Sequence, residues 1–509
     1  MLATVLSAAV SGVDGYLVEV EVDLSNGLPS FDIVGLPDIA VKESRERVRA
    51  AIKNSGLDFP LQHITVNMAP ADVKKEGASH DLPIALGILA AQGILPLEAL
   101  EGGIFLGELA LDGSVRPIHG VLPMILAAKK RDMTTIMLPE ANLNEAKVVG
   151  EVRSVPLASL TEAVAVLTGR QQPRIFSDTA VAAAPEPEFL EDLSDVKGQE
   201  QAKRALEITA AGGHNLLMIG PPGSGKTMLA RRLPSILPDL CLEEALEVTK
   251  IYSIAGMLKP GVALIRRRPF RAPHHTTSTA GLVGGGRQPR PGEVSLAHHG
   301  VLFLDEFPEF SREALEVLRQ PIEDGQVTIS RAAAALTYPS RFMLAAAMNP
   351  CPCGFVGDAG KPCTCTPLQV QRYRQKISGP LLDRIDVQIE VPRIKQEDLN
   401  DRRVAEGSAA IRERVLRARE RQISRLVDFG IHCNAHMEPK EIKLFCPLDE
   451  AGHNLLTRAM TQFGFSARTH HRLLKVARTI ADLAGEERIG LVHLAEAIQY
   501  RALDRRLGS

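Results

Sequence analysis

The chain has 509 residues, of which 45% are hydrophobic and 24% are charged, as in a folded globular protein and unlike a disordered one. This length exceeds the usual size of one hydrophobic core, so we expect two or three domains. The formal net charge of −2 excludes a uniformly basic surface as the basis of nucleic-acid binding, although it leaves room for a local basic stripe.

The N-terminus begins with apolar residues that superficially resemble a secretory signal. It lacks a basic region before the apolar run and reaches Asp14 too early for such a signal. No other apolar run approaches the roughly eighteen residues that a membrane span needs. We therefore expect a cytoplasmic protein without membrane contact, in which the seven cysteines are thiols or metal ligands rather than disulfides.

Strand-like and helix-like hydrophobic patterns alternate through the first 170 residues. The strand-like segments are residues 15–24, 64–68 and 135–138, and the helix-like segments are residues 38–55 and 82–92. This alternation predicts an N-terminal α/β domain over residues 1–170. Residues 171–192 contain three prolines beside an alanine run and are typical of an exposed linker.

A second domain is predicted over residues 193–394, followed by a helical domain over residues 395–509. Three apolar strands are expected in the second domain, at residues 216–219, 301–304 and 342–348, and each ends in polar residues. In parallel sheets such strand ends gather ligands. The C-terminal domain has heptad-like charged helical patterns at residues 404–426 and 467–483.

A glycine-rich loop follows the strand at residues 216–219 and leads into a helix that begins at Thr227. It matches G-x-x-x-x-G-K-[ST] in full, a motif whose glycines allow a close approach to phosphate. We expect Lys226 to reach the β- and γ-phosphates of ATP and Thr227 to hold Mg²⁺. The nucleotide-binding residues are Gly220, Pro221, Pro222, Gly223, Ser224, Gly225, Lys226 and Thr227.

The other two strands end in side chains suited to ATP hydrolysis. Asp305 and Glu306 follow the strand at residues 301–304, where Asp305 can orient Mg²⁺ and Glu306 can polarise the attacking water. Asn349 follows the third strand and can position the same water or sense the γ-phosphate. Each residue has a purely structural alternative, a helix cap for the carboxylates and a turn residue before a proline for Asn349.

These motifs, with Leu-Leu-Asp-Arg-Ile-Asp at residues 381–386 and Pro-Phe-Arg-Ala-Pro-His-His-Thr at residues 269–276, resemble the magnesium-chelatase-like branch of the AAA+ ATPases. The resemblance to bacterial competence proteins of that branch runs from end to end. It implies a central AAA+ P-loop domain with a parallel sheet, a C-terminal helical lid and a homohexameric ring. It also implies that Arg384 enters the neighbouring subunit's site as an arginine finger and that Arg468 is the sensor-2 arginine of the lid. Either arginine could instead form a surface ion pair.

Two segments of the second domain are candidates for contact with single-stranded or branched DNA. Residues 326–331 follow an Asp-Gly turn and are predicted to be one strand of a β-hairpin. In related ring helicases a hairpin at this place points into the central pore, which would bring Arg331 to phosphates. The glycine-rich loop at residues 276–290 carries Arg287 and Arg290, cations on an adaptable backbone. The alternative is a solvated loop and an ordinary hairpin.

Four cysteines form a C-x-C…C-x-C pattern within fifteen positions, at Cys351, Cys353, Cys363 and Cys365. Four thiolates on a loop can hold one tetrahedral Zn²⁺, so we predict a structural zinc site, with free thiols as the alternative. The remaining cysteines, Cys241, Cys433 and Cys446, are interpreted as buried small residues. Three pairs of adjacent histidines remain unassigned.

The N-terminal domain resembles the proteolytic domain of Lon-type proteases, a ribosomal-protein-S5-like α/β fold, through residues 107–118. That family needs a serine nucleophile and a lysine base. The resemblance places Asp81 at the serine position and Leu122 near the lysine position, so the dyad is expected to be absent. A shifted dyad of Ser79 with a nearby lysine is the alternative.

The sequence thus predicts a cytoplasmic ATPase that uses ATP and Mg²⁺. The family resemblance implies a hexameric ring motor that moves on DNA and drives branch migration during natural transformation. Two other functions remain open at this point. One is an ATP-dependent Lon-like protease, and the other is a chelatase-like remodeller of a protein or metallocofactor partner, whose ATPase activity would be indifferent to DNA.

Overall fold

A computed structural model describes residues 1–75, 77–176, 191–259, 261–286, 289–331, 334–358, 360–394 and 405–503. The chain divides into two compact units. The first comprises residues 1–186 and 242–265, and the second comprises residues 187–241 and 266–509. In the described ranges no helix is both long and apolar enough to cross a membrane.

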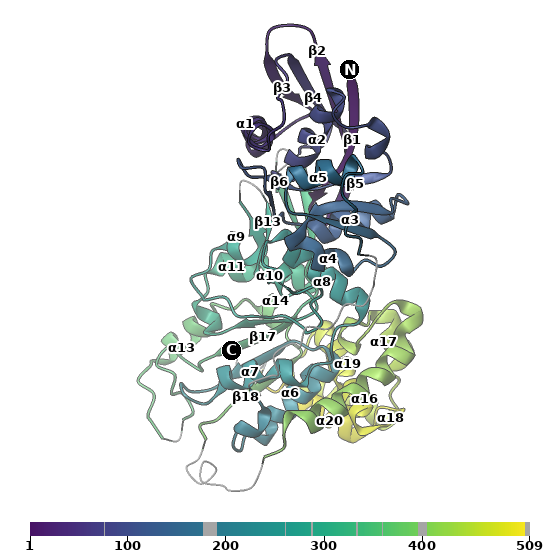
Figure 1. Ribbon diagram of the computed structural model, residues 1–509. Coiled ribbons are helices and arrows are strands. Elements are labelled where there is room, and N and C mark those ends of the chain that lie inside the picture. The colour runs from purple at the N-terminus through teal and green to yellow at the C-terminus, as the bar shows by residue number, and fades with distance from the viewer. Residues whose placement is uncertain are drawn as a thin grey trace. The chain divides into compact units, whose positions relative to one another are not determined.

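The first unit is built on a mixed seven-stranded sheet with the order β3-β4-β2-β1-β5-β8-β9 (Figure 1). β1 pairs antiparallel with β2 and parallel with β5, which places the N-terminal strand in the middle of the sheet. A short ribbon of β6 (Glu108–Leu109) and β7 (Val115–Arg116) lies outside this sheet. The seven strands are β1 (Leu2–Ser11), β2 (Asp14–Ser25), β3 (Ser30–Val34), β4 (His63–Ala69), β5 (Gly103–Phe105), β8 (Thr135–Pro139) and β9 (Arg153–Leu157).

Helices pack on the sheet of the first unit in two separate apolar cores. The larger core joins β1, β2 and β4 to α1 (Ile39–Asn54), α2 (Asp81–Ala91) and α5 (Leu160–Leu167). The smaller core joins β1, β5 and β8 to α3 (Val121–Lys129) and α4 (Leu143–Lys147). Helix α1 starts where the sequence predicts, because the Asp38 side chain accepts a hydrogen bond from Val41 N at 2.8 Å and caps it.

Helix α8 (Leu242–Ile254) belongs to the first unit, although the predicted boundaries place it in the ATPase domain at residues 193–394. Two contacts explain this grouping. Ser253 Oγ donates a hydrogen bond to Glu145 Oε2 at 2.6 Å, and Leu246 packs against the smaller core. The N-terminal unit is therefore completed by a segment inserted from the middle of the chain.

The second unit contains a five-stranded sheet with the order β11-β14-β17-β10-β18, in which every pairing is parallel. Its three central strands are entirely buried, as expected for a parallel sheet covered on both faces. Helices α6 (Glu200–Gly212) and α7 (Lys226–Ile236) share its core. The strands are β10 (Leu216–Ile219), β11 (Phe270–Arg271), β14 (Val301–Leu304), β17 (Met343–Met348) and β18 (Val387–Glu390).

Short elements connect the strands of this sheet. Between β11 and β14 lie α9 (Thr279–Val283), β12 (Gly284–Gly285), β13 (Arg290–Pro291) and α10 (Glu293–Leu296). Between β14 and β17 lie α11 (Arg312–Val317), α12 (Arg319–Asp324), β15 (Gln326–Arg331) and β16 (Ala334–Pro339). Between β17 and β18 lie α13 (Pro367–Arg374) and α14 (Gly379–Leu382).

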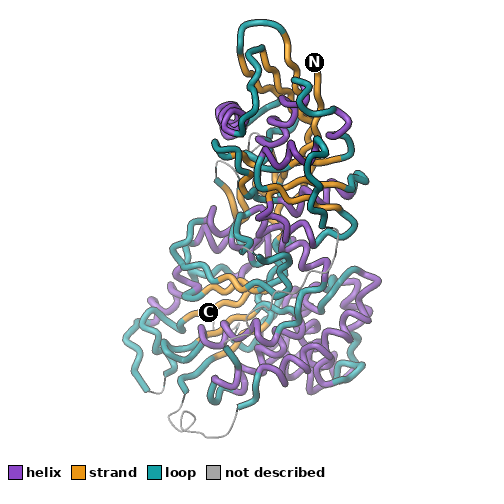
Figure 2. The backbone as a smooth tube through the Cα atoms, in the orientation of Figure 1, coloured by secondary structure: helices purple, strands orange, loops and turns teal. Residues whose placement is uncertain are grey.

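The C-terminal part of the second unit is helical, and Figure 2 shows it as helices joined by short loops. It packs through α16 and α19 against α6, which shares the core of the parallel sheet. Together with the parallel sheet and the N-terminal α/β unit, this helical part confirms the predicted fold class. The helices are α16 (Ser408–Leu426), α17 (Pro439–Phe445), α18 (Glu450–Phe463), α19 (Ala467–Ala484) and α20 (Leu491–Gln499).

Candidate functional site

Three parallel strands end at one edge of the second sheet and carry the predicted ATPase residues. β10 leads into the glycine-rich loop, β14 into Asp305 and Glu306, and β17 into Asn349. Because the strands are parallel neighbours, these groups meet around one cavity of about 420 Å³. The lining residues are 222–228, Asp305, Glu306, Met348 and Asn349.

The backbone of the glycine-rich loop requires its glycines. Gly223 and Gly225 have φ angles of +77° and +90°, in the left-handed region that side chains disfavour. A Cβ on Gly220 would lie 2.1 Å from the Val391 carbonyl oxygen. The loop also accepts a hydrogen bond at Ser224 O from Gln199 Nε2 at 2.6 Å, so it is held from outside as well as by its own geometry.

Lys226 and Thr227 join this loop to the other two strand ends. Thr227 Oγ1 donates to Asp305 Oδ2 at 2.6 Å, and Lys226 Nζ lies 3.4 Å from Asn349 Oδ1. Lys226 also donates to the carbonyl oxygens of Gly220 and Pro221 at 2.7 and 3.0 Å. Burial lowers the pKa of Lys226, because the charged form loses hydration. The structure therefore assembles the predicted lysine, threonine, aspartate and asparagine at one place.

Glu306 differs from Asp305 in the direction and the exposure of its side chain, although both residues line the cavity. Its side chain is 57% exposed, and its backbone has a φ of +51°, an uncommon conformation for a residue other than glycine. Glu306 N donates to Asp305 Oδ1 at 2.9 Å. The strand end therefore points two adjacent carboxylates in different directions, that of Asp305 toward Thr227 and that of Glu306 toward His275.

The two predicted arginines are not among the residues that line this cavity. Arg384 is 7% exposed, forms an ion pair with Glu323 and donates to Pro380 O at 2.7 Å. It borders a second cavity, also of about 420 Å³, lined largely by α11 and α12. Arg384 and, more weakly, Arg468 and Arg472 lower the pKa of Glu323. Within one chain, Arg384 therefore lies apart from the glycine-rich loop. The charge of Arg468 acts on the carboxylate of Glu323, the ion-pair partner of Arg384.

The two candidate DNA segments lie side by side. β15 pairs antiparallel with β16, which confirms the predicted hairpin, and Tyr338 Oη of β16 donates to Pro289 O beside β13 at 2.9 Å. Arg290 is exposed in β13. Arg331 ends β15, but its side chain is outside the described part, and Arg287 lies outside the described residues altogether.

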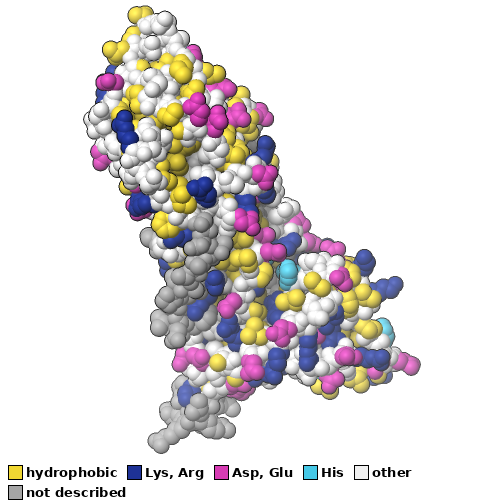
Figure 3. Space-filling model, turned by 45° about the vertical axis from the view of Figure 1, so that its right-hand side comes forward, with side chains coloured by type: hydrophobic (Ala, Val, Ile, Leu, Met, Phe, Trp, Pro, Cys, Tyr) yellow, Lys and Arg dark blue, Asp and Glu magenta, His cyan; other side chains and the backbone are white. Residues whose placement is uncertain are grey.

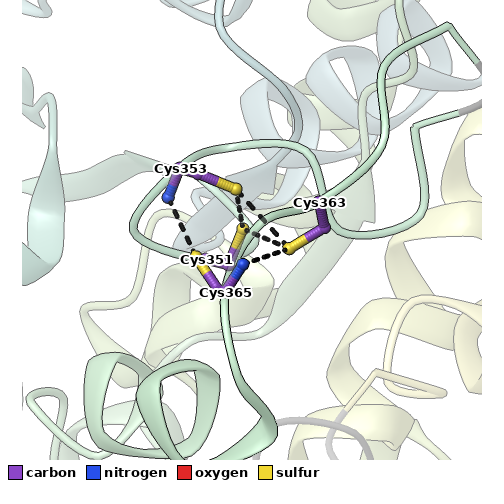
Figure 4. Close-up of side chains that lie close together, drawn as sticks. All are labelled: Cys351, Cys353, Cys363 and Cys365. Atoms are coloured by element: carbon purple, nitrogen blue, oxygen red, sulfur yellow. Dashed lines mark hydrogen bonds between the residues drawn. The ribbon is translucent and has the colours of Figure 1, made fainter.

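The four predicted cysteines come together in the loop between β17 and α13 (Figure 4). Sγ of Cys351 lies 3.4 Å from that of Cys353 and 3.7 Å from that of Cys363, and the last two are 3.5 Å apart. These distances are too long for disulfides, and a tetrahedron with metal–sulfur bonds of about 2.3 Å has edges of about 3.8 Å. Backbone N–H groups of Thr364 and Phe355 lower the pKa of Cys353 to about 5. The donor set therefore fits one tetrahedral Zn²⁺.

The cysteine loop also contacts the nucleotide cavity. Gly354 has a φ of +86°, and a Cβ on it would lie 2.5 Å from Pro222 Cδ of the phosphate loop. Asn349, which lines the cavity, is separated from Cys351 by a single proline. Of the other cysteines, Cys433 and Cys446 are buried as predicted, whereas the prediction for Cys241 is wrong: it is exposed, at the residue after which the chain leaves the second unit for the first.

The position at which Lon-type proteases carry their serine is occupied by a buried ion pair. Asp81 is 0% exposed and accepts hydrogen bonds from Arg47 Nε at 2.6 Å, from the Ser44 hydroxyl and from Leu109 N at 3.2 Å. Lys75 donates to the Pro70 carbonyl oxygen, and Leu122 is buried in α3. Asp81 and Lys75 are thus both engaged in hydrogen bonds within the fold, and the expected absence of a serine–lysine dyad, like the alternative of a shifted dyad, stays a prediction.

Sequence reasoning missed one group at the cavity. The pair His274 and His275 was unassigned, yet Nδ1 of His275 lies 3.3 Å from Glu306 Oε2. The ring centroids of the two histidines are 4.1 Å apart with their planes tilted by 34°, so these adjacent side chains lie together rather than diverge. The nearest sequence signal was their place directly after β11, the neighbour of β14 in the sheet.

Family models match three stretches of the chain. They are described as magnesium chelatase, subunit ChlI, over residues 192–399, subunit ChlI of Mg-chelatase over residues 20–142, and the magnesium chelatase subunit ChlI C-terminal region over residues 405–501. The matched stretches cover both units and the helical C-terminal part.

Individual relatives match over nearly the whole chain. The chain is 47% identical to competence protein ComM of Haemophilus influenzae, over 99% of this chain and 98% of the relative. It is 46% identical to the uncharacterized protein YifB of Escherichia coli over the same shares. A Lon protease of Mycolicibacterium smegmatis is 25% identical over 34% of this chain and 23% of its own length. The chain belongs to the ComM/YifB group of magnesium-chelatase-like AAA+ proteins.

Proposed function

We propose that this protein is an ATP-hydrolysing hexameric ring motor that acts on DNA, as a branch-migration helicase in recombination during natural transformation. The AAA+ family implies ATP and Mg²⁺ as cofactors. The observation that carries the proposal is the separation of Arg384 from an otherwise assembled nucleotide cavity. A cavity that lacks its charge-neutralising arginine can be completed by a second copy of the chain.

Within one subunit each cavity residue has a separate role in ATP binding and hydrolysis. Lys226 binds the phosphates, and Thr227 with Asp305 orients the Mg²⁺ that neutralises their charge. Glu306 polarises the attacking water, and Asn349, tied to Lys226, orients that water or senses the γ-phosphate.

Arg384 acts on the neighbouring subunit's nucleotide in this proposal, and Arg468 is the sensor-2 arginine of the lid. An arginine that enters from a second subunit stabilises the charge that develops as the phosphoryl group departs. The ion pair with Glu323 keeps Arg384 ordered within its own subunit, so its release from Glu323 accompanies ring assembly. A head-to-tail interface generates a ring when the rotation between neighbouring subunits closes, and a ring is what this proposal requires.

DNA contacts in this proposal come from the adjacent β12–β13 and β15–β16 ribbons, with Arg287, Arg290 and Arg331. On the face drawn in Figure 3, Lys and Arg side chains of the second unit are interspersed with Asp and Glu. The proposal therefore does not depend on a broad basic surface. Repetition of a few loop cations around a ring multiplies their contribution to phosphate binding. The similarity to a relative named as a competence protein supports the link to natural transformation.

The cysteine loop is proposed to hold a structural Zn²⁺ through Cys351, Cys353, Cys363 and Cys365. Elemental analysis of the purified protein should find about one zinc per chain. Cys363→Ser should lose the metal, while Cys241→Ser, which changes an exposed cysteine outside the cluster, should keep it. Equal metal content in both variants would contradict the assignment.

The proposed function is tested by ATP hydrolysis with and without single-stranded or branched DNA. We expect stimulation by DNA that disappears in Glu306→Gln, because this variant lacks the carboxylate that polarises water. Branch migration on a synthetic four-way junction follows as the second assay. Hydrolysis that is indifferent to DNA would instead favour a chelatase-like remodeller of a protein partner.

A further inference from the structure

The turn that carries Arg384 is held by two segments of the helical C-terminal part at residues 408–503, which is called the lid below. Arg472 of α19 donates from Nη1 to the Arg384 carbonyl oxygen at 3.0 Å and forms an ion pair with Asp386. Arg501, which follows α20, donates to the Ile385 carbonyl oxygen. Three consecutive residues of the turn are therefore bound to the lid.

The parallel sheet holds the same turn through Asn215, the residue before β10. Asn215 Nδ2 donates to the Arg384 carbonyl oxygen at 2.9 Å, and Asn215 N donates to Asp386 Oδ2 at 2.9 Å. Its Oδ1 accepts a hydrogen bond from Leu344 N of β17 at 2.8 Å, which fixes Asn215 to the sheet. The Arg384 carbonyl oxygen thus accepts one hydrogen bond from the sheet and one from the lid.

The ion pair between Arg472 and Asp386 is largely shielded from solvent. The Asp386 side chain is 4% exposed, and that of Arg472 is 24% exposed. A buried carboxylate is costly unless a cation and hydrogen bonds compensate its charge, and here Arg472 and Asn215 N supply them. This pair is therefore a stronger link between lid and turn than an exposed ion pair would be.

Helix α19 carries Arg468, the predicted sensor-2 arginine, one turn before Arg472. Ser466 Oγ caps this helix by accepting a hydrogen bond from Thr469 N at 3.2 Å. Side chains four positions apart lie on the same face of a helix. A displacement of α19 as one body therefore moves Arg468 together with the group that holds the Arg384 carbonyl oxygen.

We infer that Arg472 is a positioning residue that places Arg384 for the nucleotide of the neighbouring subunit, and so links the lid of one subunit to hydrolysis in the next. The role of Arg384 in this inference rests on the proposed function. Arg472 is not among the residues that line the nucleotide cavity of its own chain, so it acts through the turn. Without Arg472 the turn is held by fewer bonds, and Arg384 reaches the neighbouring phosphates less often.

Three variants of the full-length protein test this role. Arg472→Gln removes the cation, and the double variant Arg472→Gln/Asp386→Asn also removes the carboxylate that would otherwise stay buried without its partner. Arg417→Gln is the matched control, since Arg417 is a lid arginine that is 63% exposed and lies 3.8 Å from Glu413 of its own helix. Steady-state kcat and KM for ATP are measured for each variant.

Arg472→Gln and the double variant should lower kcat about tenfold, the effect of one lost charge-assisted hydrogen bond. KM for ATP should stay within about twofold of the wild type, because the glycine-rich loop is unchanged. Arg417→Gln should keep both values. A wild-type kcat in the double variant overturns the inference, because any loss in Arg472→Gln would then come from the unpaired carboxylate of Asp386.

Mixtures of two chains show which site Arg472 serves. Arg472→Gln keeps its glycine-rich loop, so an equal amount of Lys226→Ala, whose Arg384 is intact, should restore about a quarter of the wild-type rate. An equal amount of Arg384→Ala should leave the rate at or below that of Arg472→Gln alone, since neither chain then places Arg384 correctly. The reverse pattern would assign Arg472 to the site of its own subunit and overturn the inference.

The inference and the proposed function fail in distinguishable ways. If Arg384→Ala and Lys226→Ala chains restore activity to each other while Arg472→Gln gives the reverse pattern, hydrolysis between subunits stands and the role of Arg472 is overturned. If Arg384→Ala and Lys226→Ala chains stay inactive together, the action of Arg384 between subunits is overturned, and the inference about Arg472 falls with it.

Discussion

Two aspartates lie in different surroundings in the two units. Asp305 of the second unit borders a cavity, and Asp81 of the first unit belongs to a buried ion pair. Asp305 accepts from Thr227 Oγ1 and Glu306 N and lines an open cavity. Asp81 is fully buried, and both of its oxygens are engaged by Arg47, Ser44 and Leu109.

The two carboxylates differ in how many of their oxygen lone pairs remain free to bind a ligand. A buried carboxylate whose lone pairs are occupied contributes to stability and has no capacity for a ligand. A carboxylate beside a cavity keeps oxygen lone pairs for a hard cation such as Mg²⁺. The cavity beside Asp305 thus still has to bind a ligand, whereas the hydrogen bonds around Asp81 are already complete. Substitutions at the cavity should therefore change activity, and substitutions around Asp81 should change stability.

The largest expected effect on kcat comes from Arg384, the arginine that does not line the cavity of its own chain. Arg384→Ala should lower kcat about a thousandfold, the scale of an arginine finger, with little change in assembly. Mixing equal amounts of Arg384→Ala and Lys226→Ala chains should restore about a quarter of the wild-type rate, since each intact site then takes its two halves from different subunits. Arg372→Ala, at an exposed arginine of α13, is the control. Mixed chains that stay inactive would contradict action between subunits.

Removal of the lysine of the glycine-rich loop should cause the second-largest loss of kcat. Lys226→Ala should lower kcat about a hundredfold, because the charge that binds the phosphates is lost. The thermal unfolding temperature should stay constant or rise, because burial already lowers the pKa of Lys226 and so disfavours its charge. A variant that loses stability along with activity would show that the cavity is a structural element.

The opposite outcome is expected in the first unit. Asp81→Asn should destabilise α2 by about 3 kcal/mol, because it leaves the Arg47 guanidinium without its buried partner. Amide hydrogen exchange followed by mass spectrometry measures this change, and kcat should stay within about twofold of the wild type. Glu43→Gln removes an exposed partner of Arg47 and should cost less than about 0.5 kcal/mol. A large loss of hydrolysis in Asp81→Asn would break the comparison.

The smallest effect depends on pH and also lies in the first unit. Burial, with help from the charge of Lys75, lowers the pKa of His80 to about 4. Since the folded-state pKa lies below the unfolded value of about 6.5, the unfolded chain binds more protons between these values, and stability falls as the pH falls through this window. Between pH 7 and pH 4.5 the loss should be about 2 kcal/mol, measured by amide exchange in β1 and α2.

His80→Asn should remove this pH dependence while keeping a partner for Ser7, whose Oγ lies 3.1 Å from His80 Nδ1. An equal loss of stability in the variant would assign the effect to another group. Asp81 and His80 are adjacent, so both substitutions are measured singly.

Local signals in the sequence were sufficient for several elements. The apolar runs predict β10 and β14 with the bounds that the structure has, because buried parallel strands are short and continuous. Asp38 and Ser466 mark the starts of α1 and α19, since each caps the helix through a bond to a residue three positions away.

Other features depended on partners distant in sequence. The apolar start of the chain does not reveal that β1 is a central strand, because that follows from pairing with β2 and β5 together. The grouping of α8 with the first unit depends on Glu145, about a hundred residues away. Such contacts leave no periodic trace in the sequence.

By itself the sequence determined the phosphate-binding loop, the two strand-end carboxylates and the spacing of the four cysteines, because each is a local pattern whose chemistry constrains neighbouring residues. Only the tertiary structure decided that Arg384 pairs with Glu323 away from the cavity and that His275 faces Glu306. Those contacts are made across strands and helices, where the order of the sheet and the packing of side chains, rather than spacing along the chain, set which groups meet.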